Sequence, residues 1–179
     1  MNYLNAFLIA IIFLPVFSYA QNNSSQTSRE KQMIKEINLV RTAPKEYIPF
    51  VNIYLQSFPK TELNKNKKAA NELIRELKQL QPLKGLNFSN ELYVTAKAHG
   101  KWMKKKNRWE HSKINVCENL VGGIDNPRDA LIELLIDEGW KNRGHRKNIL
   151  NPNLTIVAVY EAYDKPVKGY SPVFIQQFK

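Results

Sequence analysis

The chain has 179 residues, with 27 Lys and Arg against 16 Asp and Glu and a formal net charge of +11. This balance favours anionic partners such as lipid headgroups, acidic polysaccharide or nucleic acid, although it can also serve solubility alone. The single cysteine, Cys117, excludes an internal disulfide framework, so packing must stabilise the fold. We expect Cys117 to be a buried small side chain rather than a free thiol.

The N-terminus has the pattern of an export signal. Residues 8–17 form a nearly continuous apolar run that is too short for a comfortable membrane span, and Ser18-Tyr19-Ala20 places small residues where a signal peptidase reads them. We therefore expect a signal peptide at residues 1–20, a polar linker at residues 21–28 and one domain at residues 29–179. The protein is then secreted, either to the extracellular space or to the periplasm.

The first half of the domain predicts helices. Thr27-Ser28-Arg29-Glu30 has the form of a capping box, and the spacing of the apolar residues after it predicts a helix to about Thr42. Pro44 suits the first turn of a second helix, which Pro59 ends.

Two further helices follow a polar stretch. Residues 60–68 are polar and basic and are interpreted as a solvated linker before a third helix at residues 69–80. Ser89 or Asn90 can cap a fourth helix, on which His99 lies in the apolar stripe. A histidine in that position is more often a packed residue than a ligand.

The second half predicts one more helix and then strands. Asn126-Pro127 opens this helix, and Asp137 and Glu138 extend its buried face at the C-terminal end. Acids in such a position need a cationic or metal partner. Residues 154–163 and 173–178 have the composition of strands. Helices first and a hairpin last indicate an α+β fold, with helices packed on an antiparallel sheet.

His145 lies between Gly144 and Arg146 in the connection that follows this helix. A histidine there either faces a cleft or is a solvated part of a basic loop.

Several motifs together make the chain similar to a known family. Over roughly the whole of residues 29–179 it resembles the CAP superfamily (cysteine-rich secretory proteins, antigen 5, pathogenesis-related 1), in its bacterial SCP-like branch. The residues that carry the resemblance stand in the family's order: Ile37-Asn38-Leu39-Val40-Arg41, residues 92–99, His111, Glu118-Asn119-Leu120 and Arg143-Gly144-His145-Arg146-Lys147-Asn148-Ile149-Leu150.

The resemblance implies a single-domain α-β-α sandwich with a large central cleft. It also implies that the cleft carries two histidines and two acids, and that in some members the histidines bind zinc or another divalent cation. Carried over by position, these residues are His111, Glu118, His145 and Asp137, with Glu138 as the fallback for the second acid.

Two imidazoles and two carboxylates suit Zn²⁺, with the imidazoles as ligands and the carboxylates either completing the shell or orienting the histidines. Without a metal, the same groups can pair as histidine–carboxylate hydrogen bonds.

Two departures from the family pattern bear on the cleft. Cys117 replaces the usual glycine before the Glu-Asn pair, and could reshape the cleft floor or place a thiol in it. Asp137 is shorter than the usual glutamate and less able to reach.

Three functions are compatible with this sequence. The favoured one is a secreted, non-catalytic binding module for lipid, glycan or an extracellular protein, because no nucleophile signature accompanies the histidines. The second is a metal-dependent hydrolase of protein or cell-envelope polymer. The third is an electrostatic binder of acidic polysaccharide, lipid or nucleic acid, although export and the lack of a nucleic-acid motif disfavour nucleic acid. The cations available to it are Lys104, Lys105, Lys106, Arg108, Lys141, Arg143, Arg146 and Lys147.

Some of these cations have a second interpretation. Arg143, Arg146 and Lys147 flank His145 and are possible contacts for an anionic ligand. Arg143 and Arg146 could instead fix the loop by bonding carboxylates.

Overall fold

The computed structural model describes the backbone of residues 26–179 and the side chains of residues 26–59 and 66–179. The predicted signal peptide at residues 1–20 and most of the predicted linker lie outside the described residues. None of the helices within residues 26–179 is both long and apolar enough to cross a lipid bilayer.

The first three helices are α1 (Ser28–Thr42), α2 (Pro44–Gln56) and α3 (Lys60–Gln79). The capping box of α1 is confirmed, because the Thr27 side chain accepts from the Glu30 backbone while the Glu30 carboxylate accepts from the Thr27 backbone. The predicted linker at residues 60–68 is wrong, since α3 already begins at Lys60. That stretch contains no proline or glycine, and its polar residues suit the solvent side of a helix as well as a loop.

The later helices are α4 (Asn90–Lys106), α5 (Pro127–Ile136) and α6 (Gly144–Ile149). The predicted caps of α4 and α5 are confirmed, with Ser89 accepting from Leu92 and Asn126 accepting from Arg128. The connection around His145 contains α6, which the sequence did not predict. Six residues are too few to show a helical period of apolar residues.

Four strands form one sheet in the order β1-β3-β4-β2. They are β1 (Asn87–Phe88), β2 (Cys117–Gly122), β3 (Ile156–Ala162) and β4 (Val173–Phe178). The predicted hairpin is the antiparallel pair of β3 and β4, and β2 adds antiparallel to β4. The prediction of a wholly antiparallel sheet is wrong in one respect, because β1 pairs parallel with β3. Two residues carry too little pattern for β1 to be read from the sequence.

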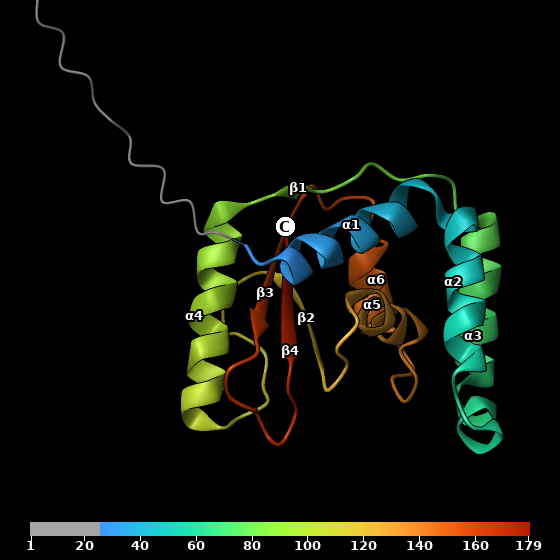
Figure 1. Ribbon diagram of the computed structural model, residues 1–179. Coiled ribbons are helices and arrows are strands. Elements are labelled where there is room, and N and C mark those ends of the chain that lie inside the picture. Colours follow the sequence, from blue (N-terminus) through green and yellow to red (C-terminus); the bar gives the residue numbers. More distant parts are fainter. Residues whose placement is uncertain (1–25) are drawn as a thin grey trace, which may run out of the picture.

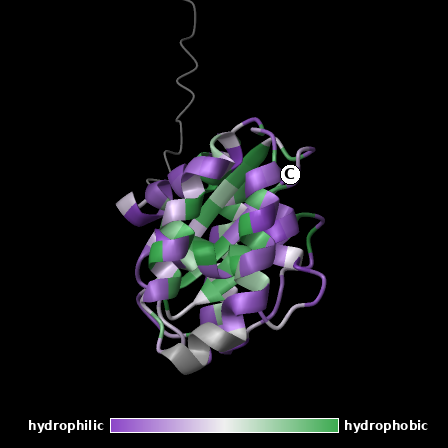
Figure 2. Ribbon diagram, turned by 90° about the vertical axis from the view of Figure 1, so that its right-hand side faces the viewer, coloured by the Kyte–Doolittle hydropathy of each residue, from purple (hydrophilic) through white to green (hydrophobic). Residues whose placement is uncertain are grey.

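The elements form the predicted α-β-α layers, with α4 on one side of the strands and α5, α6, α2 and α3 on the other (Figure 1). Side chains of β4 alternate between the two layers. Phe174 and Phe178 belong to the core on the side of α1, α2, α3 and α5, whereas Val173 and Ile175 belong to the core under α4. In the view from the side of α2 and α3, hydrophobic residues gather in the interior of the ribbon and hydrophilic ones along its periphery (Figure 2).

Arg41 connects the end of α1 to two distant loops. Its guanidinium is fully buried and donates to the carbonyl oxygens of Lys84 at 3.0 Å, Ile149 at 2.7 Å, Asn151 at 2.9 Å and Leu154 at 3.4 Å. One side chain thus fixes both the segment before β1 and the segment between α6 and β3. Buried carbonyl groups need such partners, because an unmade hydrogen bond in the interior is costly.

Candidate functional site

The site is built around two neighbouring cross-strand residue pairs between β2 and β4. Glu118 of β2 stands opposite Gln177 of β4, and Asn119 stands opposite Gln176. Because consecutive strand residues point to opposite faces, the first pair faces α4 and the second faces α5 and α6. The contacts agree with this alternation, since Gln177 accepts from Thr95 of α4, while Asn119 donates to the backbone carbonyl of His145.

The Glu118 carboxylate is the centre of a first histidine–acid pair. It is buried, and its Oε1 lies 3.1 Å from His111 Nδ1 and accepts from the Ser112 backbone at 2.8 Å. Its Oε2 accepts from Gln177 Nε2 at 2.8 Å. The Nδ1 atom of His111 is therefore turned toward Glu118, which leaves Nε2 for other partners. The His111 ring itself is 57% exposed.

The two partners shift each other's pKa. The hydrogen bond with Glu118 raises the pKa of His111 above its ordinary 6.5, against the opposing effect of partial burial. Burial raises the pKa of Glu118, but hydrogen bonds from His111, Gln177 and Ser112 outweigh it, so the pKa lies below the ordinary 4.5. Between pH 4.5 and 6.5 the pair is thus an imidazolium facing a carboxylate.

These shifts give a pH-dependent stability. The raised pKa of His111 stabilises the fold fully below pH 6.5, and that contribution is lost as pH rises through the folded-state pKa. The lowered pKa of Glu118 stabilises it above pH 4.5, and that contribution is lost as pH falls through its own folded-state pKa. We expect both contributions in full between these two values.

In an NMR titration, Glu118→Gln should return the pKa of His111 toward 6.5, whereas Glu46→Gln, at an exposed position on α2, should leave it unchanged. A His111 titration that is the same in Glu118→Gln contradicts the pairing.

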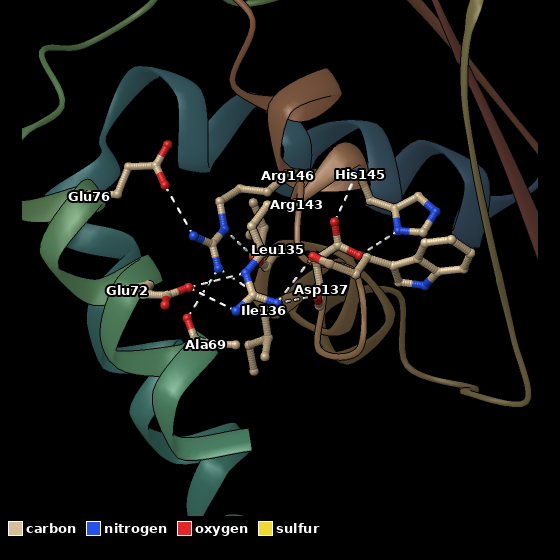
Figure 3. A network of polar contacts seen from close by, with 10 residues as sticks. Ala69, Glu72, Glu76, Leu135, Ile136, Asp137, Arg143, His145 and Arg146 are labelled. Carbon is tan, nitrogen blue, oxygen red and sulfur yellow. Dashed lines mark hydrogen bonds and ion pairs between the residues drawn. The ribbon is translucent and has the colours of Figure 1, made fainter. Parts of the chain in front are cut away.

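Asp137 and His145 form a second pair of the same kind. Asp137 Oδ1 lies 2.7 Å from His145 Nδ1, and Oδ2 accepts from the His145 backbone at 2.9 Å (Figure 3). Asp137 caps the C-terminus of α5 in the left-handed conformation with φ 54°, which aspartate adopts more readily than most residues. This turn brings the short side chain to the histidine. Its carboxylate is 1% exposed.

The fallback acid, Glu138, is exposed and is not the partner of His145. It lines the same large cavity as Asp137 without bonding either histidine within the described part of the chain. The sequence pattern could not separate the two acids, because only the left-handed turn at the end of α5 decides which one points inward.

Both histidine–acid pairs face one cleft. A cavity of about 610 Å³ is lined by His111 and His145 together with Asp137 and Trp140, and a smaller one of about 220 Å³ is lined by both histidines and Glu118. Among the side chains of residues 26–59 and 66–179, no group of three or more His, Cys, Asp or Glu is arranged to hold a metal ion.

The glutamines that hold the two histidine–acid pairs were not predicted from the sequence. Gln177 and Gln176 are fully buried on opposite faces of β4, and Gln176 accepts from Asn119, which also accepts from Asn148. Thr95 holds the Gln177 amide by a hydrogen bond of 2.6 Å. Two adjacent glutamines in an otherwise apolar strand were the available signal, because buried polar side chains need partners.

The arginines beside His145 point away from the cleft, toward α3 (Figure 3). Arg143 donates to Glu72 at 2.8 and 3.1 Å and to the Asp137 carbonyl at 2.7 Å. Arg146 is buried and donates to Glu76 and to the carbonyl oxygens of Ala69, Leu135 and Ile136. These contacts correspond to the alternative in which the two arginines fix the loop. Lys147 is exposed and lines neither cavity that the histidines share.

Two other residues singled out in the sequence lie near the site. His99 is packed, as predicted, with its ring stacked on Trp102 at 5.8 Å and its Nε2 atom 3.7 Å from Glu118 Oε1. Cys117 is partly buried against the core of the helical layer, on the face of β2 opposite to Glu118. It lines neither of the two cavities that the histidines share.

Comparison with known proteins shows what the chain is similar to. Residues 36–178 match the profile of the Cysteine-rich secretory protein family (CAP). The chain is also 32% identical to the uncharacterized protein YkwD of Bacillus subtilis (strain 168), over 49% of this chain and 39% of that protein. The chain thus spans well under half the length of this relative.

Proposed function

Because the chain belongs to the cysteine-rich secretory protein (CAP) family, we propose that it is a secreted, non-catalytic binding module. Its ligand would enter the cleft between His111 and His145, where a divalent cation such as zinc can also be held. The partner would be a lipid, a glycan or an extracellular protein. The apolar run at residues 8–17 supports the export part of this proposal.

The observation that carries the proposal is the orientation of the two imidazoles. Each has its Nδ1 atom against a buried carboxylate, at 3.1 Å for His111 and 2.7 Å for His145. In metal sites, a carboxylate on one ring nitrogen fixes the tautomer and makes the other nitrogen a better ligand. Glu118 and Asp137 would thus act through the histidines rather than as ligands themselves.

The two imidazoles are the kind of ligand that zinc prefers, but they are too few to complete its coordination. Structural zinc sites take four protein ligands and catalytic sites take three, whereas this cleft offers two imidazole nitrogens. The bound ion would supply a positive centre for an oxygen or nitrogen atom of the ligand. The chain's own residues would orient the two imidazoles.

The hydroxyl groups around the cavities support binding over covalent catalysis. Thr95 and Ser112 line a neighbouring cavity of about 440 Å³ that His111 also lines, and Tyr170 lines the large cavity. None of these three hydroxyls forms a hydrogen bond with a histidine within the described residues. A serine nucleophile needs a base within hydrogen-bonding reach. The Ser112 hydroxyl follows His111 directly but has no hydrogen-bond partner there.

Zinc titration calorimetry tests the proposal. We expect one zinc ion per chain for the purified protein and loss of that binding in the double variant His111→Ala/His145→Ala. The single variant His99→Ala is the matched control, since it removes the third histidine, which lines neither cavity that His111 and His145 share, and it should still bind zinc. Equal binding by the double variant would exclude the two histidines as the site. No heat with the native protein would exclude the metal.

A further inference from the structure

Three exposed aromatic side chains surround the large cavity. Trp109 is 37% exposed, Trp140 63% and Tyr170 51%, and all three line the cavity of about 610 Å³. They come from three different connections: the segment after α4, the segment between α5 and α6, and the segment between β3 and β4. Large apolar side chains that stay exposed around a hollow mark a binding surface.

These rings are already held in place. Trp109 and Tyr170 contact each other with their centroids 5.3 Å apart, and both lie over Gly122 at the end of β2. A Cβ atom at Gly122 would come within 2.9 Å of the Trp109 ring and of the Tyr170 Cβ atom, so the glycine lets both side chains lie close to the strand. Trp140 meets the ring of His145 edge to face, at 6.3 Å between centroids. A ligand would thus meet preformed aromatic walls.

The lining of the cavity differs in charge from the rest of the chain. It contains four acids, the two histidines and, among the described residues, no lysine or arginine, although the whole chain carries +11. Asp137 is paired with His145, and Glu133 accepts from the Tyr54 hydroxyl. Glu138 is exposed next to the aromatic walls, and Glu110 is partly buried.

Exposed cations stand beside each aromatic residue in the chain. Arg108 precedes Trp109, Lys141 follows Trp140, and Lys168 lies two residues before Tyr170, all of them exposed. They do not line the cavity. The hollow is therefore acidic and aromatic, whereas the chain segments that form its walls carry positive charge.

From this arrangement we propose that the cleft binds the side chain of a lysine or arginine that belongs to an otherwise acidic segment of a partner polypeptide. The cationic group would lie against the aromatic rings and near Glu138, where cation–π attraction and the carboxylate act together. The acidic residues of the segment would face the surrounding lysines and arginines. This inference rests on the proposed binding function and names its partner. An anionic lipid or acidic glycan in the same hollow would meet carboxylates instead.

Fluorescence anisotropy with labelled nine-residue peptides tests this inference on the purified protein in a chelating buffer, which separates it from the zinc titration. The probes are an acidic peptide with one central lysine, the same peptide with arginine, and the same peptide with glutamine. We expect the lysine and arginine peptides to bind at least about tenfold more tightly than the glutamine peptide. Their affinity should fall as salt is added.

Variants and a competitor locate the contact. Trp140→Ala and Glu138→Gln should each weaken binding of the lysine peptide by about five- to tenfold. Tyr163→Ala removes a ring that is 61% exposed but outside the cavity and should leave binding unchanged. Equal affinity for the glutamine peptide overturns the inference. Competition by butylammonium at the affinity of the peptide also overturns it, because the polypeptide would then contribute nothing.

Discussion

Replacing Arg41 by methionine is expected to lower the free energy of unfolding by about 3 kcal/mol or more. Methionine fills much of the space but leaves the carbonyl oxygens of Lys84, Ile149, Asn151 and Leu154 without their donor. The Ile149 carbonyl is buried and keeps the cost of its lost hydration, whereas the other three bonds are partly buried and lose less each. For a domain of this size, a loss of about 3 kcal/mol corresponds to a melting temperature lower by about 6–12 °C.

Denaturant unfolding followed by circular dichroism measures this loss. Arg75→Met is the matched control, because Arg75 is an exposed arginine on α3, and it should change the free energy of unfolding by less than about 0.5 kcal/mol. If Arg41→Met unfolds at the same denaturant concentration as the native protein, the four hydrogen bonds do not stabilise the fold as argued.

Replacing Arg146 by methionine is expected to cost about 2–4 kcal/mol and also to disturb the candidate site. Arg146 donates to the carbonyl oxygens of Leu135 and Ile136, the last two residues of α5 before Asp137. Without it, the left-handed turn that aims Asp137 at His145 loses two of its buried contacts and keeps the hydrogen bond from Arg143 to the Asp137 carbonyl. In NMR spectra of the variant, the ring signals of His145 should broaden or move, while those of His111 stay in place.

Arg143→Met compares the buried Arg146 with a more exposed arginine that also contacts this turn. Arg143 carries the same charge, pairs with the partly exposed Glu72 and donates to the backbone of Asp137, but its side chain is 17% exposed against 4% for Arg146. Its removal should cost less, about 1 kcal/mol, since water can replace part of the lost contacts. A larger effect of Arg143→Met than of Arg146→Met would contradict the role given to Arg146.

The parts of the fold that could be predicted are those with a local signature. The capping box at Thr27 and Glu30 satisfies its own hydrogen bonds within four residues, and the hairpin of β3 and β4 shows in consecutive β-branched and aromatic residues. Local signals failed where a segment was short or polar. The helix α6 and the strand β1 have too few residues for a period, and the start of α3 is as polar as a linker.

The sequence could name candidate site residues but not their geometry. Family resemblance named His111, Glu118, Asp137 and His145, and the structure pairs them through two carboxylates. Which acid meets His145 depends on one backbone turn, and the support of Glu118 depends on Gln177, 59 residues away in the chain. Strand register brings these two residues together, and nothing in the residues around either one specifies that register.

The two histidine–acid pairs are held by different layers of the fold. Glu118 and Asn119 are neighbours on β2, yet one belongs to the layer with α4 and the other contacts the layer with α6. Within the described residues no hydrogen bond joins one pair to the other. The distance between the two imidazoles therefore depends on how the two helical layers are placed relative to the sheet. A ligand that touches both histidines would act as a clamp between the layers. Its binding would slow amide hydrogen exchange in α4 and α5 together, although neither helix needs to touch it.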